Sequence, residues 1–414
     1  MKYQKIISSI LLASAFAACS QLEEEITATE TAPTGHKDGN SNVEIRLSSG
    51  NSLTRSMLNP IDDHGNFNAD EIGIFMLATA GTGVNPKAYP ILWRSYTDDA
   101  DHAEPVVLNN VRAKAVYNTT ENITEIKWAK VEENQWKIDE GAHYWYPFDN
   151  WYAYRFFGYS PYQGTVTQTD GIRSVTFGPE VLDGKHDIIY GYSDQASGAT
   201  GTVESLKYCA KYFRQTGSAT PNIHFEHKLM ALQFKVYGLE NIDGNFNDAR
   251  KVGISRILIK DIPKTSATLI IADMNNPGNN GKITFNGGNW STADGEIEIT
   301  NEDGSDLFTR VPEAGVGGAV TVGSSIMLPV PPAGSSHKFR VYIELKSVND
   351  LGVVDANSIT YDVKHPFDLN FNSFEEGKIF DINIGIAGPQ EIKINATLNE
   401  WEEATDEPTH LEFN

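Results

Sequence analysis

The sequence predicts an all-β protein with two antiparallel β-sandwich domains in tandem. From Val43 onward, short runs alternate apolar and polar residues with a period of two, as in Phe339–Leu345 and Phe380–Ile386. No segment sustains three turns of an amphipathic helix. The folded part, roughly 370 residues long, is too large for one sandwich and suits two. We therefore expect an N-terminal domain at residues 42–218 and a C-terminal domain at residues 219–414.

The chain begins with the pattern of a secretion signal, which we expect to occupy residues 1–18. Lys2 and Lys5 precede an apolar run that is too short to remain in a membrane as a helix. Small residues then precede Cys19, where bacterial lipoproteins are cut and acylated. The sequence thus indicates a lipoprotein signal peptide, with Cys19 as the lipidation site, typically a palmitate. Ordinary secretion is the alternative, with cleavage after Ala17 at an A-x-A site.

Charge and cysteine content narrow the possible partners. The only other cysteine is Cys209, so no intramolecular disulfide forms once Cys19 is acylated, and the state of Cys209 stays open. Removing residues 1–18 takes away two lysines and leaves 31 basic against 55 acidic side chains, a formal charge of −24. Such a surface repels nucleic acid and anionic lipid head groups. Membrane attachment is therefore expected through acyl chains rather than a basic patch.

Residues 19–41 are expected to form a flexible acidic tether. The stretch is rich in Thr, Glu, Pro, Gly and Asn and has too few apolar residues for a core. Its acidic triplet Glu23-Glu24-Glu25, which directly follows Ser20-Gln21, resembles the export tag that sends lipoproteins of Bacteroidota to the outer face of the outer membrane.

The strands that follow are predicted from alternation and from the turns between them. Val43–Leu47 places three apolar side chains on one face, and Glu391–Leu398 alternates over eight residues. We place the domain boundary near residues 217–221. Turn signals that separate strands at hairpin-like spacing are Asn276–Asn279, Gly287-Gly288, Asp303-Gly304 and Ala333-Gly334.

Searches for catalytic or metal chemistry are negative, and we expect no catalytic residue, cofactor or metal. The sequence has no His-Glu-x-x-His, no Gly-x-Ser-x-Gly, no phosphate loop and no paired-cysteine metal site. His224 and His227 are three residues apart in a strand-like run, so they fall on opposite faces and have a structural role. The acidic runs Asp62–Asn66 and Asn301–Asp306 carry oxygen ligands that calcium accepts, but neither has the glycine at the sixth position of an EF-hand loop, so they are interpreted as solvated turns.

An aromatic passage has two interpretations. Residues 143–148 and 151–159 hold the densest group of rings in the chain. Aromatic faces that stack on sugars would make the passage a glycan-binding platform. Core packing is the other interpretation, because a strand such as Tyr152–Phe157 sends alternate rings inward.

The chain resembles a fimbrillin-type protein, a member of the subunit class that forms the type V pili of Bacteroidales. The resemblance runs along most of the mature chain, and its landmarks occur in the family's order. They are Thr54-Arg55-Ser56, Asp70–Phe75, Trp145-Tyr146-Pro147 to Tyr152-Ala153-Tyr154, Asp187–Tyr190, Phe225–Leu229, Leu328–Pro331, and Ile392–Leu398 with Asn399-Glu400-Trp401.

The resemblance implies two transthyretin-like sandwich domains and assembly by strand exchange. In the family, an arginine-specific protease removes the lipidated first strand, and the vacated groove accepts a strand from a neighbouring subunit. Val43–Leu47 is then the removable strand and Arg55 the candidate processing site. Arg46 is disfavoured because strand pairing would protect it. Alternatively, Arg55 is a loop arginine in a protein that is never processed.

The expected function is that of a structural and adhesive surface lipoprotein, a pilus subunit of the outer membrane or fimbrium. Its partners would be other pilin subunits, the outer membrane through the lipid anchor, and a host or bacterial surface ligand, with no nucleic acid. In a shaft subunit, Glu391–Leu398 or Thr409–Asn414 would donate a strand, whereas a tip or anchor subunit need not; the tip, accessory or shaft role stays open. A carbohydrate-binding surface lipoprotein is the alternative, and a glycosidase ranks third.

Overall fold

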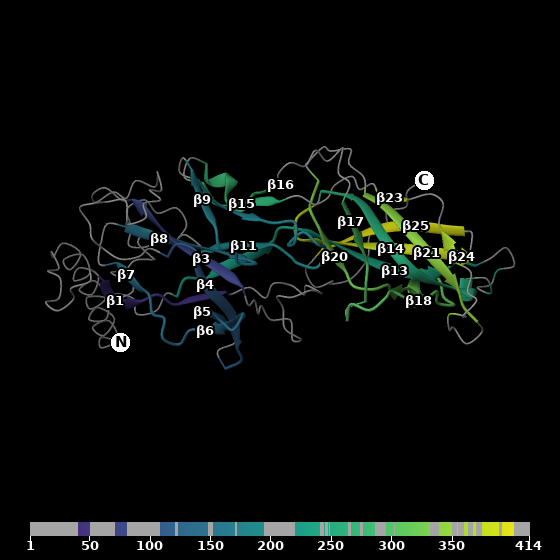
Figure 1. The fold of residues 1–414 in the computed structure, drawn as a ribbon, viewed down its shortest axis with the longest axis horizontal. Helices are drawn as coiled ribbons and strands as arrows, with labels where there is room; N and C mark the ends of the chain where they lie inside the picture. Colours follow the sequence, from purple (N-terminus) through teal and green to yellow (C-terminus); the bar gives the residue numbers. More distant parts are fainter. Residues whose placement is uncertain are drawn as a thin grey trace, which may run out of the picture.

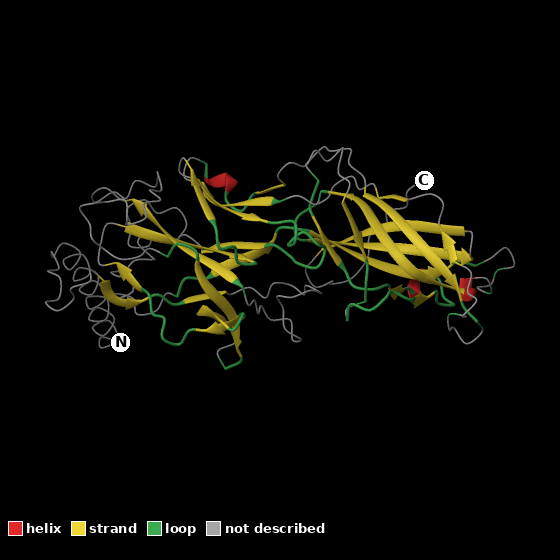
Figure 2. Ribbon diagram, in the orientation of Figure 1, coloured by secondary structure: helices red, strands yellow, loops and turns green. Residues whose placement is uncertain are grey.

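The structure is a computed structural model. It describes residues 40–49, 71–80, 108–120, 123–147, 152–169, 172–193, 220–240, 244, 247, 249–263, 266–273, 276–285, 295–301, 303–331, 339–349, 354, 360–362, 367–369, 375–388 and 391–400. The regular secondary structure of these residues is almost entirely β-strand, so the all-β prediction is confirmed (Figure 2). The only described helices are three single turns, η3 (Ala249–Lys251), η4 (Pro277–Asn279) and η6 (Val316–Gly318). No described helix has the length and apolar character needed to cross a membrane.

The first lobe contains an eight-stranded antiparallel sheet. Its strand order is β12-β11-β8-β3-β4-β5-β2, and β6 pairs with β5 beside this path. The bounds are β2 (Leu47–Ser49), β3 (Ile72–Ala80), β4 (Val111–Asn118), β5 (Ile123–Glu132), β6 (Gln135–Ile138), β8 (Tyr152–Ser160), β11 (Ile189–Ser193) and β12 (Ile223–His227).

Two smaller sheets accompany it. A two-stranded sheet joins β1 (Asn40–Glu44) to β7 (Trp145–Pro147), and a four-stranded sheet has the order β16-β15-β10-β9. The bounds of the latter are β9 (Val166–Thr169), β10 (Ile172–Phe177), β15 (Ala267–Asp273) and β16 (Ile283–Phe285). Its residues Val175 and Leu269 are buried in one core cluster with Phe157 and Tyr159 of β8. Tyr159 meets Phe177 edge to face at 6.1 Å, so the two sheets share a core.

The second lobe is a sandwich of two sheets. One has the order β19-β13-β24-β25, with β20 also paired to β13, and the other has the order β17-β14-β21-β22, with β18 on β14 and β23 on β21. The bounds are β13 (Met230–Gly238), β14 (Val252–Ile262), β17 (Gly295–Glu298), β18 (Thr309–Arg310), β19 (Val320–Thr321), β20 (Ile326–Leu328), β21 (Phe339–Ser347), β22 (Thr360–Asp362), β23 (Phe367–Leu369), β24 (Lys378–Gly388) and β25 (Glu391–Glu400).

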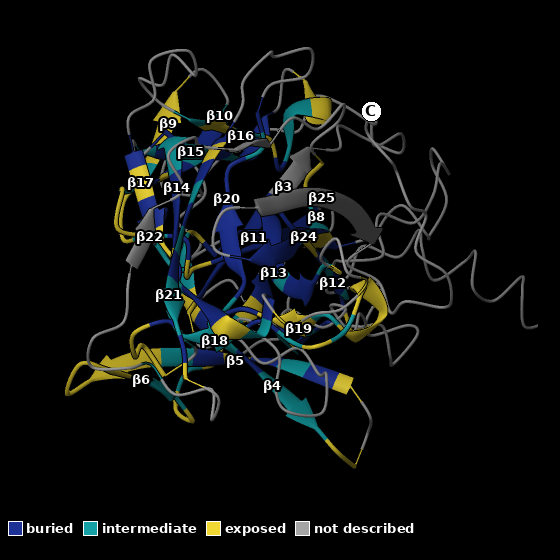
Figure 3. Ribbon diagram, turned by 90° about the vertical axis from the view of Figure 1, so that its right-hand side faces the viewer, coloured by how far each residue is buried: buried dark blue, intermediate teal, exposed yellow. Residues whose placement is uncertain are grey.

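The core of the second lobe comes from both of its sheets. Phe234 of β13 and Ile382 of β24 are fully buried with Ile257 of β14 and Val341 of β21. Figure 3, drawn along the long axis, shows buried central strands such as β11 and β13, while β6 and the mostly exposed β9 lie at the periphery. The two lobes lie one after the other along the long axis (Figure 1).

One hairpin from the second half of the chain belongs to the first lobe. Strand β15 pairs with β10 from Ile172↔Asp273 to Phe177↔Ala267, and β16 pairs with β15 (Figure 1). Gly281 in this hairpin has φ +77°, and a Cβ there would lie 2.5 Å from the Tyr190 ring of β11. The predicted domain boundary at residues 218/219 lies outside the described residues, and that division stays a prediction.

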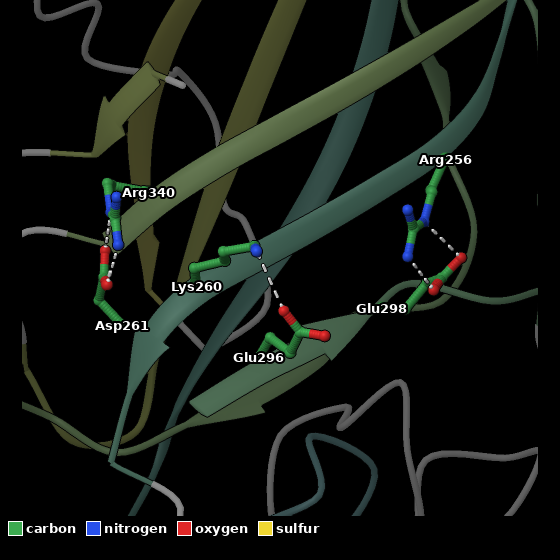
Figure 4. Close-up of polar contacts among 6 residues, drawn as sticks. All are labelled: Arg256, Lys260, Asp261, Glu296, Glu298 and Arg340. Carbon is green, nitrogen blue, oxygen red and sulfur yellow. Dashed lines mark hydrogen bonds and ion pairs between the residues drawn. The ribbon is translucent and has the colours of Figure 1, made fainter. Parts of the chain in front are cut away.

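Ion pairs cross the outer face of the β17-β14-β21 sheet. Arg256 donates from Nε and Nη2 to the two carboxylate oxygens of Glu298, each at 2.9 Å. The Nζ of Lys260 lies 3.2 Å from Glu296, and Arg340 pairs with Asp261 (Figure 4). These side chains lie opposite the buried apolar face of the same strands, so this surface is a solvated charged face.

Candidate functional site: the first strands and their slot

The segment Asn40–Ser49 forms two short strands with a break between them. Strand β1 pairs with β7, with Glu44 opposite Trp145. Strand β2 pairs with β5, with Leu47 opposite Ile126. The prediction of one continuous strand at Val43–Leu47 is therefore wrong, because the strand is broken at Ile45 and Arg46. Its alternation is correct, because Val43 packs against the core and Ile45 and Leu47 are buried in it. Alternation reports which side chains are buried and does not specify the hydrogen-bonding partner.

Strand β2 is one end of the large sheet, and it also contacts the residues directly before β12, the strand at the other end. On one side it pairs with β5. On the other side the Ser48 N–H donates to the carbonyl of Pro221 at 3.0 Å, and Ser48 forms a parallel bridge with Asn222, directly before β12. Because β12 and β2 stand at opposite ends of the strand order, β2 closes the sheet on itself. We call the space between β5 and residues 221–222 the first-strand slot.

Buried side chains hold the segment in this slot. Ile45 and Leu47 are 1% and 3% exposed and belong to the core cluster of the first lobe, and Ser49 is also buried. Burial of each of the two apolar side chains contributes about 1.5–3 kcal/mol. The Ile45 N–H also donates to the Tyr144 carbonyl at 2.8 Å. Removing the segment would expose an apolar groove and unpaired backbone groups along β5.

A charged contact lies over the break. The Glu44 carboxylate accepts hydrogen bonds from His143 Nδ1 at 2.6 Å and from Arg46 Nε at 2.9 Å. The bond from His143 is the main cause that lowers the pKa of Glu44, and Arg46 adds to it. The Arg46 side chain is 78% exposed and belongs to neither strand. The expectation that strand pairing covers Arg46 is therefore wrong, because the break exposes it.

The predicted carboxyl-terminal donor lies at a sheet edge. Strand β25 pairs antiparallel with β24 along its length, from Lys378↔Glu400 to Gly388↔Glu391. On its other side, β24 pairs in parallel with β13. Among the described residues β25 has no second neighbour, so one edge of its backbone is unpaired there.

Several predicted features lie outside the described residues. These are the lipidation site Cys19, the processing site Arg55, Cys209, the acidic run Asp62–Asn66, and the alternative donor Thr409–Asn414.

The aromatic passage packs into the first-lobe core. Tyr146, Tyr154, Phe156, Phe157 and Tyr159 are all buried there, and Tyr146 meets Phe156 edge to face at 6.2 Å. Burial raises the pKa of Tyr159 well above its ordinary value. The core interpretation is confirmed for these rings, which therefore cannot form the glycan platform considered from the sequence.

The two histidines and the acidic run Asn301–Asp306 have the structural roles that the sequence suggests. Along β12, His227 is buried and hydrogen-bonded to the buried Asp187, whereas His224 lies on the opposite face. In the turn after Asn301, its Nδ2 donates to Ser305 Oγ, and Asp303 accepts the Ser305 N–H. In the described part of the chain, no three His, Cys, Asp or Glu side chains are placed to hold a metal ion.

The sequence did not reveal what holds the first strands in place. Strand β5, His143 and Pro221 lie far from Ser48 along the chain. No local pattern connects them, because a strand's alternation carries no information about distant partners.

Comparison with known proteins identifies relatives. A family model described as fimbrillin-like matches residues 54–401 of this chain. The chain is similar in structure to a fimbrial protein from Bacteroides vulgatus, with 14% identity and a TM-score of 0.49, over 87% of this chain and 100% of that one. It is also similar to a fimbrilin from Porphyromonas gingivalis, with 9% identity and a TM-score of 0.35, over 87% of this chain and 98% of that one. No curated protein matches it.

Proposed function

This chain belongs to the fimbrillin-like family, and from that premise we propose that it is an adhesive structural subunit that assembles into a surface fimbria by exchange of its first strand. Family membership implies a cell-surface or fimbrial location and association with other pilin subunits. We propose that the protein has a structural role without enzymatic activity.

The observation that carries the proposal is the position of β2. It closes the large sheet between β5 and residues 221–222, and it is the last described strand before the chain reaches Arg55. A cut after Arg55 would leave residues 40–49 attached to the subunit by non-covalent contacts alone. Their loss would open the first-strand slot along its whole length.

A strand from a neighbouring subunit would then fill the slot. Strand β25 is an edge strand whose sequence carries Ile392, Ile394, Ala396 and Leu398 at alternate positions. The first strands carry Val43, Ile45 and Leu47 at the same spacing. A donor with this alternation would place apolar side chains in the core and polar ones outward, as the departing segment does.

Before maturation, we propose that the signal peptide at residues 1–18 is removed and that Cys19 is acylated. Residues 19–41 would serve as the tether between the lipid and the folded part. The protein would then stand on the outer membrane as a lipoprotein until the cut after Arg55 releases it for assembly.

The proposal is tested with an arginine-specific protease acting on the purified full chain. The wild-type protein should gain an amino terminus at Ser56 and form polymers visible by electron microscopy. Arg55→Gln should keep the upstream residues and stay monomeric. Arg46→Gln, a matched arginine change in an exposed break, should be processed like the wild type. Polymers from Arg55→Gln, or a complete cut after Arg55 with no polymer, would contradict strand exchange.

A further inference from the structure

Three side chains from separate elements meet on the first lobe. Arg112 of β4 has its guanidinium carbon 5.7 Å from the ring centre of Trp136 of β6 and 5.1 Å from that of Tyr162, which follows β8. The two rings meet edge to face at 5.2 Å. Arg112 is exposed and both rings are half-buried. We call these three residues the Arg112 cluster. Strand β6, which carries Trp136, lies at the periphery of the lobe (Figure 3).

Arg112 differs from the other exposed arginines in the described part of the chain. Each of those lies within 4.0 Å of a carboxylate oxygen; they are Arg46, Arg256 and Arg340. The half-buried Arg250 and Arg310 also have a carboxylate neighbour within that distance. The Arg112 guanidinium lies over the two rings, and among the described residues no acidic side chain pairs with it. The whole chain has 55 acidic and 33 basic residues. A cation left without a carboxylate on so acidic a protein is free to bind an anion from outside.

Hydrogen bonds hold the backbone at and beside the two rings of the cluster. Beside Tyr162, the Gln163 N–H donates to the hydroxyl of the buried Tyr159 at 2.9 Å, and the Gln163 carbonyl accepts from Asn110 Nδ2 at 2.7 Å. Lys114 Nζ donates to the Trp136 carbonyl at 3.2 Å. The backbone that carries both rings is therefore held in place before any ligand arrives, which lowers the entropy cost of binding.

We propose that the Arg112 cluster binds a carboxylated sugar, such as a sialic or uronic acid. The guanidinium would bind the carboxylate through two parallel N–H donors, as planar arginine forks do. The exposed parts of Trp136 and Tyr162 would lie against the apolar face of the sugar ring. An acidic peptide would use the arginine but not the two rings. This inference rests on the adhesive part of the proposed function and gives it a ligand class.

Binding is measured by calorimetry and saturation-transfer NMR with the full chain. The probes are 3′-sialyllactose and a glucuronate-containing disaccharide, with lactose, the methyl ester of sialyllactose and a hexaglutamate peptide for comparison. Variants Arg112→Gln and Trp136→Leu test the cluster. Arg256→Gln and Tyr192→Leu are matched controls, because they change an exposed arginine and an exposed aromatic residue elsewhere. Thermal melts confirm that every variant is folded.

The wild type should bind at least one carboxylated sugar and should bind neither lactose nor the ester. Arg112→Gln and Trp136→Leu should weaken this binding by about tenfold or more, and the controls should leave it unchanged. Binding of neither carboxylated sugar, equal binding by folded Arg112→Gln, or equal binding of hexaglutamate would overturn the proposal. All four variants should polymerise after protease treatment like the wild type, so failure of this ligand and failure of strand exchange are distinguishable.

Discussion

Replacing Leu47 by alanine should destabilise the first lobe strongly. Leu47 is 3% exposed and lies in the first-lobe core on the strand that closes the large sheet. A buried leucine cut back to alanine costs about 2–5 kcal/mol, because its transfer free energy is lost and a cavity remains. We take about 3 kcal/mol, since the short β2 segment allows the neighbouring side chains some relaxation.

The assay is urea unfolding followed by intrinsic fluorescence. With a urea m-value of about 3 kcal/mol per molar, the loss should lower the unfolding midpoint by about 1 M. Val131→Ala is the matched control, because Val131 is 42% exposed on β5, the strand that pairs with β2. Its effect should stay within about 0.5 kcal/mol. A midpoint shift for Leu47→Ala no larger than that of Val131→Ala would refute the claim that β2 is an integral part of the first lobe.

Three further predictions concern other parts of the fold. Gly281→Ala should lower the free energy of unfolding by about 2–5 kcal/mol in thermal melts, because it adds a Cβ at positive φ against the Tyr190 ring. The control Gly244→Ala, at positive φ in open space, should lower it by about 1–2 kcal/mol. Equal losses would contradict tight packing of the hairpin on β11. A double-mutant cycle of Arg256→Ala and Glu298→Ala should give a coupling of about 0.2–1 kcal/mol that falls in 0.5 M salt, and a larger salt-independent coupling would rule out a solvated pair. The pKa of Glu44 is lowered in the folded state, so its stabilisation is complete above the ordinary value of 4.5 and is lost as pH falls through the lower folded pKa. The urea midpoint of Glu44→Gln should therefore lie below the wild type at pH 7 and approach it at pH 3, and a constant gap would argue against the contact with His143.

The sequence predicts strands better than it predicts their partners. Strand β21 has the expected alternation, with Phe339, Val341, Ile343 and Leu345 buried on one face. The alternation of β24 predicts a half-buried antiparallel strand; its pairing with β25 is antiparallel as expected, but its pairing with β13 on the other side is parallel. Its buried Asp381 pairs with Lys235 of β13 at 2.5 Å. Two neighbours pair both backbone edges of β24, and most of its side chains on both faces are buried, which local alternation does not reveal.

The pairing of strands that are distant in sequence cannot be predicted from local patterns, for the same reason. The turn at Asn276–Asn279 was predicted, and it forms η4 between β15 and β16. That the hairpin crosses to β10 of the first lobe has no local signal, since β10 is about ninety residues away in sequence. The Arg112 cluster was likewise missed, because its three members are widely spaced and match no motif.

The most direct test of the account is the amino terminus of the protein in fibres recovered from the native cell surface, determined by mass spectrometry. Strand exchange predicts that chains within the fibre begin at Ser56 and lack residues 40–49. Assembled fibres whose chains still carry an acylated Cys19 and the uncut peptide bond after Arg55 would contradict it, because the first-strand slot would then still hold its own strand.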